Sequence, residues 1–157
     1  MRFVRAQREL DALRNEWTTL VALLTDPDIA SYGARIVDEV VELGPVMRTL
    51  NGAPASAYRD HDWLMDRLAA ARCDAVWPGW GFVSEDAAFV ARCEAAGLVF
   101  IGPSSTAMRA LGDKIASKRL AAAAGLPLVP WEELTPASDV ASLGARVGYP
   151  LMVKAAA

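Results

Sequence analysis

The sequence predicts an α/β protein in which a parallel sheet has helices on both faces. Short apolar runs that are typical of buried strands alternate with longer segments in which apolar residues recur every three or four positions. Turn-forming Gly, Pro, Asn and Asp separate these segments. Because consecutive parallel strands need right-handed helical crossovers, this order predicts a doubly wound parallel-sheet domain over residues 1–104.

Residues 1–104 contain the elements of that domain. Apolar side chains between Phe3 and Trp17 share one stripe, which predicts an amphipathic helix. A second helix is expected to begin at Ser84, which suits an N-cap, and to stop before Gly97, which suits the position after a helix. The expected elements in order are a helix over 2–17, a strand over 18–24 with a turn at 25–28, a short helix over 29–38, a strand over 39–43, a surface loop over 44–57, a helix over 62–72, a strand over 73–77, a helix over 84–96 and a strand over 98–101.

Residues 105–157 predict the incomplete start of a second domain. The segment ends without a cap, a turn or a closing element, so its strands are expected to lack part of their sheet. The expected elements are helices over 105–111, 114–124 and 137–147, with strands over 126–129 and 149–154.

The composition fits a packed globular protein and disfavours several functional classes. The chain has 157 residues, about one domain, and 54% of them are hydrophobic. Sixteen basic residues face nineteen acidic ones, and no segment interleaves basic with aromatic residues, so nucleic acid and membrane surfaces are not expected partners. No run approaches the ~18 apolar residues of a membrane span. Small molecules or proteins are the expected partners.

Cysteine and histidine usage disfavours a metal site. Cys73 and Cys93 lie in apolar segments without Cys-x-x-Cys spacing, which is typical of buried thiols in a reducing compartment, so a cytoplasmic protein is expected. His61 is the only histidine and lies in a polar run, where a solvated residue at a helix start is the simpler interpretation. A zinc site or a Ser/His/Asp triad therefore lacks residues.

A glycine-rich segment, WPGWGFVSE at residues 77–85, lies between an expected strand and an expected helix. Ligands of open α/β sheets bind beyond the carboxyl ends of strands, where glycine lets the backbone approach them closely. This segment is therefore a candidate ligand-facing loop. A tight turn with two packing tryptophans explains the same residues without a ligand.

Two lysines occupy positions that suit an anionic ligand. Lys114 stands at an expected helix start, where a cation gains nothing from the helix dipole unless an anion is near. Lys154 ends an apolar segment. Because a lysine rarely lies against a core without a charged partner, a role in facing a phosphate is the more specific interpretation. A solvated Lys114 beyond an Asp113 cap and a Lys154 that extends to solvent are the plain alternatives.

Five motifs in one order resemble the biotin carboxylase family of the ATP-grasp superfamily. That family carries a Pro-Gly-(Tyr/Trp)-Gly-x-x-Ser-Glu loop, a Phe-Ile-Gly-Pro strand end, a Gly-Asp-Lys segment, an Ala-Gly-apolar-Pro link and a Gly-Tyr-Pro-(apolar)3-Lys segment. In this sequence they stand at residues 78–85, 100–103, 112–114, 124–127 and 148–154. Trp77, Trp80, the LGDKIAS segment at 111–117 and the Pro-Trp pair at 130–131 look most like the multidomain acetyl-CoA carboxylases.

The resemblance implies a Rossmann-like domain that precedes an ATP-grasp domain, and a ligase that uses ATP, Mg²⁺ and biotin. Lys114 and Lys154 would contact the ATP phosphates, and Trp80, Gly81 and Glu85 would line the cleft for bicarbonate and biotin. The family's magnesium ligands and catalytic residues correspond to no residue of this chain. Implied partners are a biotin carboxyl carrier domain, a carboxyltransferase of the parent enzyme and further copies in a homo-oligomer.

Differences from the family pattern predict a fragment that is inactive alone. The family's opening strand is expected before residue 1, and its glycine-rich ATP loop after Lys154. A non-catalytic α/β piece that binds proteins is one alternative. Another ATP-grasp ligase, such as carbamoyl-phosphate synthetase, is a second, although it lacks the loop at 78–85. A dehydrogenase is disfavoured because no Gly-x-Gly-x-x-Gly follows a strand.

Overall fold

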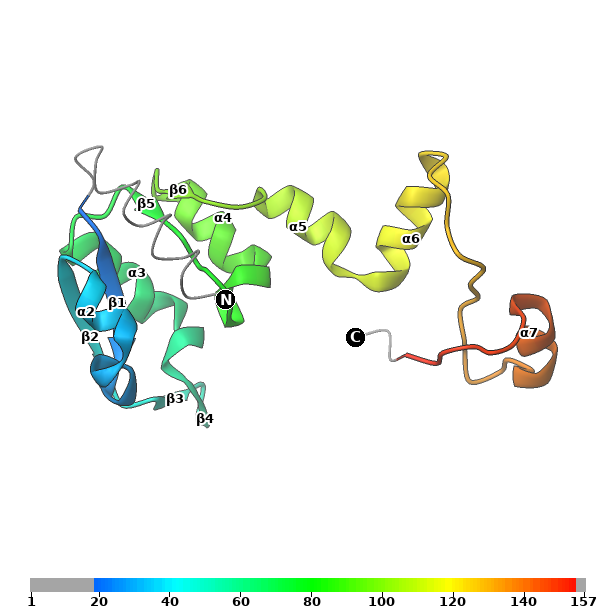
Figure 1. Cartoon of the computed structure of the whole chain (residues 1–157), viewed down its shortest axis with the longest axis horizontal. Coiled ribbons are helices and arrows are strands. Elements are labelled where there is room, and N and C mark those ends of the chain that lie inside the picture. The colour runs from blue at the N-terminus through cyan, green and yellow to red at the C-terminus, as the bar shows by residue number, and fades with distance from the viewer. Residues whose placement is uncertain (1–18, 155–157) are drawn as a thin grey trace. The chain divides into compact units, whose positions relative to one another are not determined.

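The computed structural model describes residues 19–154 (Figure 1), and the chain divides into two compact units, Met1–Gly102 and Pro103–Ala157. The helix expected over residues 2–17 lies outside the described residues. Each unit is described by itself below.

Parallel strands joined by helices form the first unit and confirm the α/β class. Strand β1 (Val21–Thr25) pairs parallel with β2 (Glu39–Gly44), and between them lie the 3₁₀ helix η1 (Asp26–Ala30) and helix α2 (Tyr32–Ile36). Strand β5 (Ala75–Val76) pairs parallel with β6 (Val99–Phe100), and α4 (Ala87–Ala95) lies between them in the chain.

The parallel strands form separate pairs, whereas one continuous sheet was expected. Strands β5 and β6 are also shorter than the predicted runs over 73–77 and 98–101. The reason lies in the helix ends before them: the amides of Cys73 and Leu98 donate to Leu68 and Cys93 carbonyls at 3.0 and 2.9 Å. These amides complete helix termini and are therefore not available to a sheet.

The prediction of a surface loop over residues 44–57 is wrong, because the segment folds as an antiparallel hairpin. Strand β3 (Met47–Leu50) pairs with β4 (Ala53–Ser56) across Asn51 and Gly52. Both turn residues have positive φ, +50° and +80°, as a two-residue type I′ turn requires. The Asn-Gly pair is the strongest short hairpin signal in a sequence, and the absence of clear alternation on either side of it explains the wrong prediction.

Aspartates cap the two long helices of the first unit. Asp60, after the 3₁₀ helix η2 (Ala57–Arg59), accepts from the Trp63 amide at 3.0 Å and starts α3 (His61–Ala70). Asp86 accepts from the amides that follow it and starts α4. The expected N-cap at Ser84 is wrong, since that residue belongs to the 3₁₀ helix η3 (Phe82–Glu85). Gly97, at φ +74°, follows α4 as expected.

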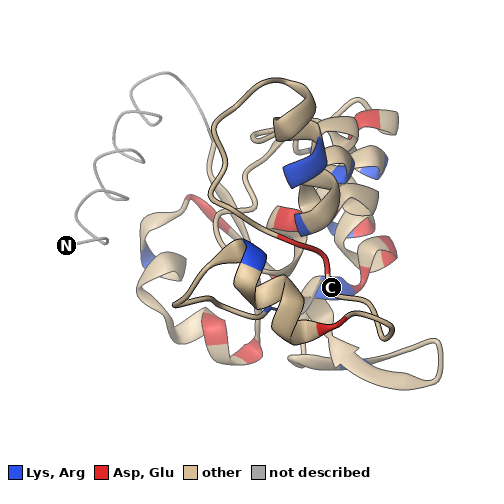
Figure 2. Cartoon of the chain, turned by 90° about the vertical axis from the view of Figure 1, so that its right-hand side faces the viewer, with Lys and Arg blue, Asp and Glu red and all other residues tan. Residues whose placement is uncertain are grey.

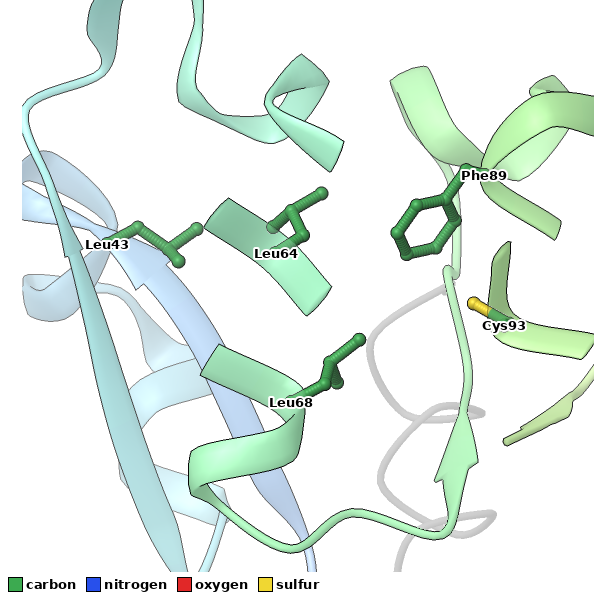
Figure 3. Close-up of a cluster of buried hydrophobic side chains, with 5 residues drawn as sticks. All are labelled: Leu43, Leu64, Leu68, Phe89 and Cys93. Atoms are coloured by element: carbon green, nitrogen blue, oxygen red, sulfur yellow. The ribbon is translucent and has the colours of Figure 1, made fainter. Parts of the chain in front are cut away.

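A cluster of buried apolar side chains joins β2, α3 and α4 (Figure 3). Phe89 is 1% exposed, and its ring meets that of Phe100 on β6 edge-on at 6.5 Å. Burial raises the pKa of both free thiols, Cys73 and Cys93, which disfavours the reactive thiolate. The cluster consists of Leu43, Leu64, Leu68, Phe89 and Cys93.

A polar network at the end of β1 makes stability sensitive to acid. Asp28 accepts hydrogen bonds from the hydroxyls of Thr25 at 2.6 Å and Tyr58 at 2.8 Å, and these lower the pKa of Asp28 below its ordinary 3.8. The folded state favours the ionised Asp28 carboxylate. The stabilisation that Asp28 contributes is therefore fully present above the pKa of the unfolded chain, and it is lost as the pH falls through the lower pKa of the folded state.

We therefore expect the urea midpoint of the chain to fall below about pH 4. Asp28→Asn should lower the midpoint at pH 7 and flatten its decline in acid, because one titrating group is gone. The measurement is urea denaturation followed by circular dichroism between pH 3 and pH 7. Identical declines in the two proteins would show that the network at Asp28 does not supply the acid sensitivity.

The second unit contains α5 (Ser105–Gly112), α6 (Lys114–Ala123) and α7 (Val140–Val147). These helices confirm the expected ones, and Ser104, Asp113 and Asp139 cap them. The strands expected over 126–129 and 149–154 are wrong, because neither segment pairs with another strand among residues 19–154. A strand needs a neighbour to satisfy its backbone groups, and apolar runs alone cannot provide one.

Side-chain contacts hold the segment between α6 and α7 instead. Arg119 of α6 pairs with Glu133, and Arg146 of α7 pairs with Glu132 at 3.1 Å. The ammonium group of Lys118 lies 5.1 Å from the ring of Trp131. The segment is therefore ordered against both helices without forming a sheet.

Candidate functional site

The candidate site begins with the tryptophan loop, defined as residues 77–85, which follows β5 directly. Gly79 and Gly81 have φ of +58° and +157°, conformations that side chains with a Cβ rarely adopt. The Ser84 hydroxyl donates to the Gly81 carbonyl at 2.6 Å, which closes the turn into η3. The loop is thus a defined turn at the carboxyl end of a parallel strand, as the sequence predicts.

Large aromatic side chains of this loop face solvent. Trp80 is 98% exposed, and Trp77 and Phe82 are more than half exposed. A packing turn would bury its tryptophans, so the simpler alternative considered from sequence does not describe Trp80. Glu85 is also exposed. An exposed indole on a rigid turn suits stacking against a ligand or a partner surface.

His61 contacts the end of this loop, and its interpretation as a merely solvated residue is wrong. Its Nε2 lies 3.0 Å from Oδ2 of Asp86, and its ring packs at 5.4 Å from that of Phe89. Burial opposes ionisation of Asp86, but amide hydrogen bonds from Phe89 and Ala88, together with His61, lower its pKa overall. Sequence analysis missed this contact because the two residues lie 25 positions apart, and spacing carries no sign of it.

Lys114 is the first residue of α6 in the second unit. Asp113 precedes it and caps the helix by accepting from the Ala116 amide at 2.6 Å, which leaves the ammonium group free of the capping role. The side chain is exposed and forms no ion pair with residues 19–154. A cation at a helix start that has no counter-ion among the described residues is chemically suited to a phosphate.

Lys154 ends the extended segment that follows α7, in the same unit as Lys114. Its side chain is exposed, and within the described part of the chain it also lacks an ion pair. The preceding Tyr149 packs against Gly144 of α7, where even one added Cβ would collide with its ring. That contact fixes where the segment leaves the helix. Convergence of the two ammonium groups on one phosphate chain stays a prediction.

Other chemistry is scarce in the described residues. Residues 19–154 contain no group of three His, Cys, Asp or Glu side chains arranged to hold a metal ion. None of the helices in this range has the length and apolarity needed to cross a membrane. Basic and acidic residues are interspersed along the described chain (Figure 2). The candidate functional residues are therefore the tryptophan loop in the first unit and, separately, the two lysines in the second.

Comparison with protein families identifies the first two thirds of the chain. Residues 1–108 match the model described as "Biotin carboxylase, N-terminal domain". The alpha chain of human mitochondrial propionyl-CoA carboxylase is 40% identical over 141 residues, which cover 87% of this chain and 18% of the relative. A putative urea carboxylase of Emericella nidulans is 35% identical over 139 residues, which cover 87% of this chain and 11% of that protein.

Solved structures agree with this match. The biotin carboxylase domain of a single-chain bacterial carboxylase aligns with a TM-score of 0.76 at 34% identity, over 95% of this chain and 33% of that one. A Campylobacter jejuni biotin carboxylase–βγ-ATP complex aligns with a TM-score of 0.75 at 26% identity, over 92% and 32% of the two chains. The chain spans less than a quarter of the curated relatives it matches. By its sequence and its fold, the chain belongs to the biotin carboxylase N-terminal domain family of biotin-dependent carboxylases.

Proposed function

We propose that the chain is the N-terminal part of an ATP-dependent biotin carboxylase and acts only within a larger enzyme. The family match over residues 1–108 is the observation that carries this proposal. In the proposed reaction the γ-phosphoryl group of ATP passes to bicarbonate and ADP is released. The carboxyphosphate formed then gives up inorganic phosphate as its carboxyl group passes to a ureido nitrogen of biotin, which loses its proton. The match to biotin carboxylases favours this ligase over carbamoyl-phosphate synthetase and over a non-catalytic interaction piece.

We assign residues 1–104 to the biotin carboxylase N-terminal domain and residues 105–157 to the start of an ATP-grasp domain. In this assignment Lys114 and Lys154 hold the ATP phosphates. Phosphoryl transfer depends mainly on positioning and charge neutralisation, which two ammonium groups supply without a covalent intermediate. Their exposure and their lack of ion pairs within residues 19–154 support the role. Magnesium would be held by carboxylates of the larger enzyme.

The tryptophan loop is assigned to the cleft for bicarbonate and biotin. Trp80 would offer an apolar face to the bicyclic ring of biotin, and the positive φ values of Gly79 and Gly81 let the backbone come close to a ligand. Glu85 would place a carboxylate beside them. The 98% exposure of Trp80 supports this role, because so large an apolar surface is costly without a partner.

For the parent enzyme we propose a multidomain acetyl-CoA carboxylase of the cytoplasm. The tryptophan form of the loop and the LGDKIAS segment at 111–117 support the choice of acetyl-CoA. Curated relatives include propionyl-CoA, methylcrotonoyl-CoA and urea carboxylases, so the acyl group needs a direct test. Supplying acetyl-, propionyl- and methylcrotonoyl-CoA to the full-length enzyme decides between them. The proposed partners are the biotin carboxyl carrier domain, the carboxyltransferase and a second copy of the enzyme.

Replacement of Trp80 tests the role of the loop. In the full-length enzyme, Trp80→Ala should raise the KM for free biotin about tenfold, because one aromatic contact worth roughly 1–2 kcal/mol is lost. The KM for ATP should stay within twofold. The measurement is bicarbonate-dependent ATP cleavage stimulated by free biotin.

Two further variants make this test specific. Trp80→Phe keeps an aromatic face and should recover most of the biotin affinity. Met47→Ala removes an exposed apolar side chain from the hairpin, outside the loop, and should behave as the wild type. An unchanged KM for biotin in Trp80→Ala would remove the loop from the biotin cleft.

A further inference from the structure

We infer that His61 is a positioning residue that holds the tryptophan loop in its conformation through Asp86. The inference rests on the proposed function of the loop for its catalytic consequence, but its structural part does not. His61 comes from α3, whereas Asp86 directly follows the tryptophan loop and caps α4. The contact therefore joins two elements that are far apart in the sequence.

The carboxylate of Asp86 divides its two oxygens between separate tasks. Oδ1 accepts from the amides of Ala88 and Phe89 at 2.9 and 3.1 Å, which fixes the start of α4. Oδ2 faces Nε2 of His61 at 3.0 Å. An ordinary N-cap makes only the contacts of Oδ1 with the backbone amides. The contact of Oδ2 with His61 links the backbone that follows the loop to the first residue of α3.

A second contact secures the other end of η3. The guanidinium carbon of Arg59 lies 5.7 Å from the ring centre of Phe82, the first residue of η3. Arg59 and His61 stand two positions apart, so one short stretch of chain contacts η3 at its first residue and Asp86 just after its last. The loop also forms local hydrogen bonds: the Ser84 hydroxyl donates to the Gly81 carbonyl at 2.6 Å, and the Ser84 and Asp86 amides donate to the Gly81 and Val83 carbonyls at 3.2 and 3.4 Å.

The surroundings of His61 favour a fixed side chain. Its side chain is 20% exposed and packs against the ring of the fully buried Phe89. A histidine held on one side by a core ring and on the other by a carboxylate has little rotamer freedom left to lose. Loss of the imidazole therefore frees the end of the loop while the core ring stays in place.

The chain offers a matched control in an ion pair between α3 and α4. Arg92 Nη2 lies 2.5 Å from Oδ1 of Asp62, the residue next to His61, and the Asp62 side chain is 86% exposed. This pair joins the same two helices and contacts no residue of the tryptophan loop in the described structure. Asp62→Asn removes its charge without touching Asp86.

Hydrogen exchange of the loop amides, followed by mass spectrometry on the chain, tests the positioning role. His61→Ala should speed exchange at Ser84, Asp86 and Ala88 about fivefold, which is the change expected for one lost hydrogen bond of ordinary strength. His61→Gln places an amide nitrogen at similar reach and should restore most of the protection. Asp62→Asn should leave the loop unchanged.

Three results overturn the inference. The first is unchanged loop exchange in His61→Ala, and the second is an equal effect in Asp62→Asn. The third is a uniform rise in exchange that includes β1 and β2, which would mean that His61 supports the whole unit and not the loop.

Kinetics of the full-length enzyme then separate this inference from the proposed function. If both hold, His61→Ala should raise the KM for free biotin about three- to fivefold with an unchanged KM for ATP, because a misplaced loop weakens positioning of one substrate. His61→Gln should return the KM for biotin toward the wild-type value. Faster loop exchange with an unchanged KM for biotin would keep His61 as a positioning residue and remove the loop from the biotin cleft.

Discussion

In the full-length enzyme, Lys114→Ala and Lys154→Ala should each slow bicarbonate-dependent ATP cleavage and raise the KM for ATP. Each change removes a charge-assisted contact to a phosphate worth about 1.5–3 kcal/mol, which corresponds to roughly 10- to 100-fold in kcat/KM. The ammonium group neutralises charge on the migrating phosphoryl group, so kcat should fall as well as affinity. Steady-state ATP cleavage at saturating bicarbonate measures both.

A lysine of the same helix provides the control. Lys118 lies one turn after Lys114 on α6 and faces the ring of Trp131 instead of a candidate ligand. Lys118→Ala should leave kcat/KM for ATP within about threefold, because this partly exposed cation–π contact is worth only about 1 kcal/mol and involves no candidate ligand. Lysine-to-arginine changes at 114 and 154 should recover part of the rate by keeping the charge. Wild-type kinetics in both alanine variants would remove the phosphate roles.

The double variant tests whether the two lysines serve one phosphate chain. Groups that contact the same ligand are coupled, so Lys114→Ala combined with Lys154→Ala should cost less than the sum of the single losses. Strict additivity would mean that the two side chains act at independent places. This measurement tests the convergence of the two ammonium groups directly.

Local sequence signals predicted the helices well. Asp113 caps α6, and Gly97 adopts the positive φ that its position after a helix suggests. The helices expected over 62–72 and 137–147 begin at His61 and Val140, after caps at Asp60 and Asp139 that were not predicted. These signals depend on neighbouring residues alone, so spacing is enough to find them. The exception at Ser84 arose because serine and aspartate compete for the cap two residues apart, and the carboxylate of Asp86 captures two amides.

Strand pairing could not be predicted to the same extent. An apolar run such as residues 126–129 satisfies the periodicity of a strand, but its backbone needs a partner that local sequence does not specify. The hairpin at Asn51 shows the converse error: the turn signal was present, but the flanking residues lack clear alternation. Which strands pair depends on the whole fold, whereas the sequence pattern identifies only segments that could form strands.

The candidate functional residues, too, could be predicted from the sequence only in part. Glycine spacing located the tryptophan loop, because a turn at a strand end is a local feature. The exposure of Trp80 needed the structure, since the sequence fits a packed and an exposed indole equally well. His61 was expected at a helix start, where it lies, but its contact with Asp86 was not predicted, as this partner is brought to it only when α3 and α4 pack together.

Phe89→Ala should destabilise the chain more than any single change in the loop. Its side chain is 1% exposed and joins α4 to the cluster of α3 and β2, so truncation leaves a cavity. Phenylalanine-to-alanine changes in such cores cost about 3–5 kcal/mol, a large part of the 5–15 kcal/mol that holds a typical domain folded. Urea denaturation should show a much lower midpoint at an unchanged dependence on urea concentration.

Phe82→Ala provides the comparison, because Phe82 belongs to the same unit but is 58% exposed. It should cost less than about 1 kcal/mol, mostly through the contact with Arg59. If both variants shifted the midpoint equally, the cluster around Phe89 would not be the core of the unit. Because the Phe89 ring also packs against His61, the same truncation should loosen the tryptophan loop even at urea concentrations where the unit remains folded.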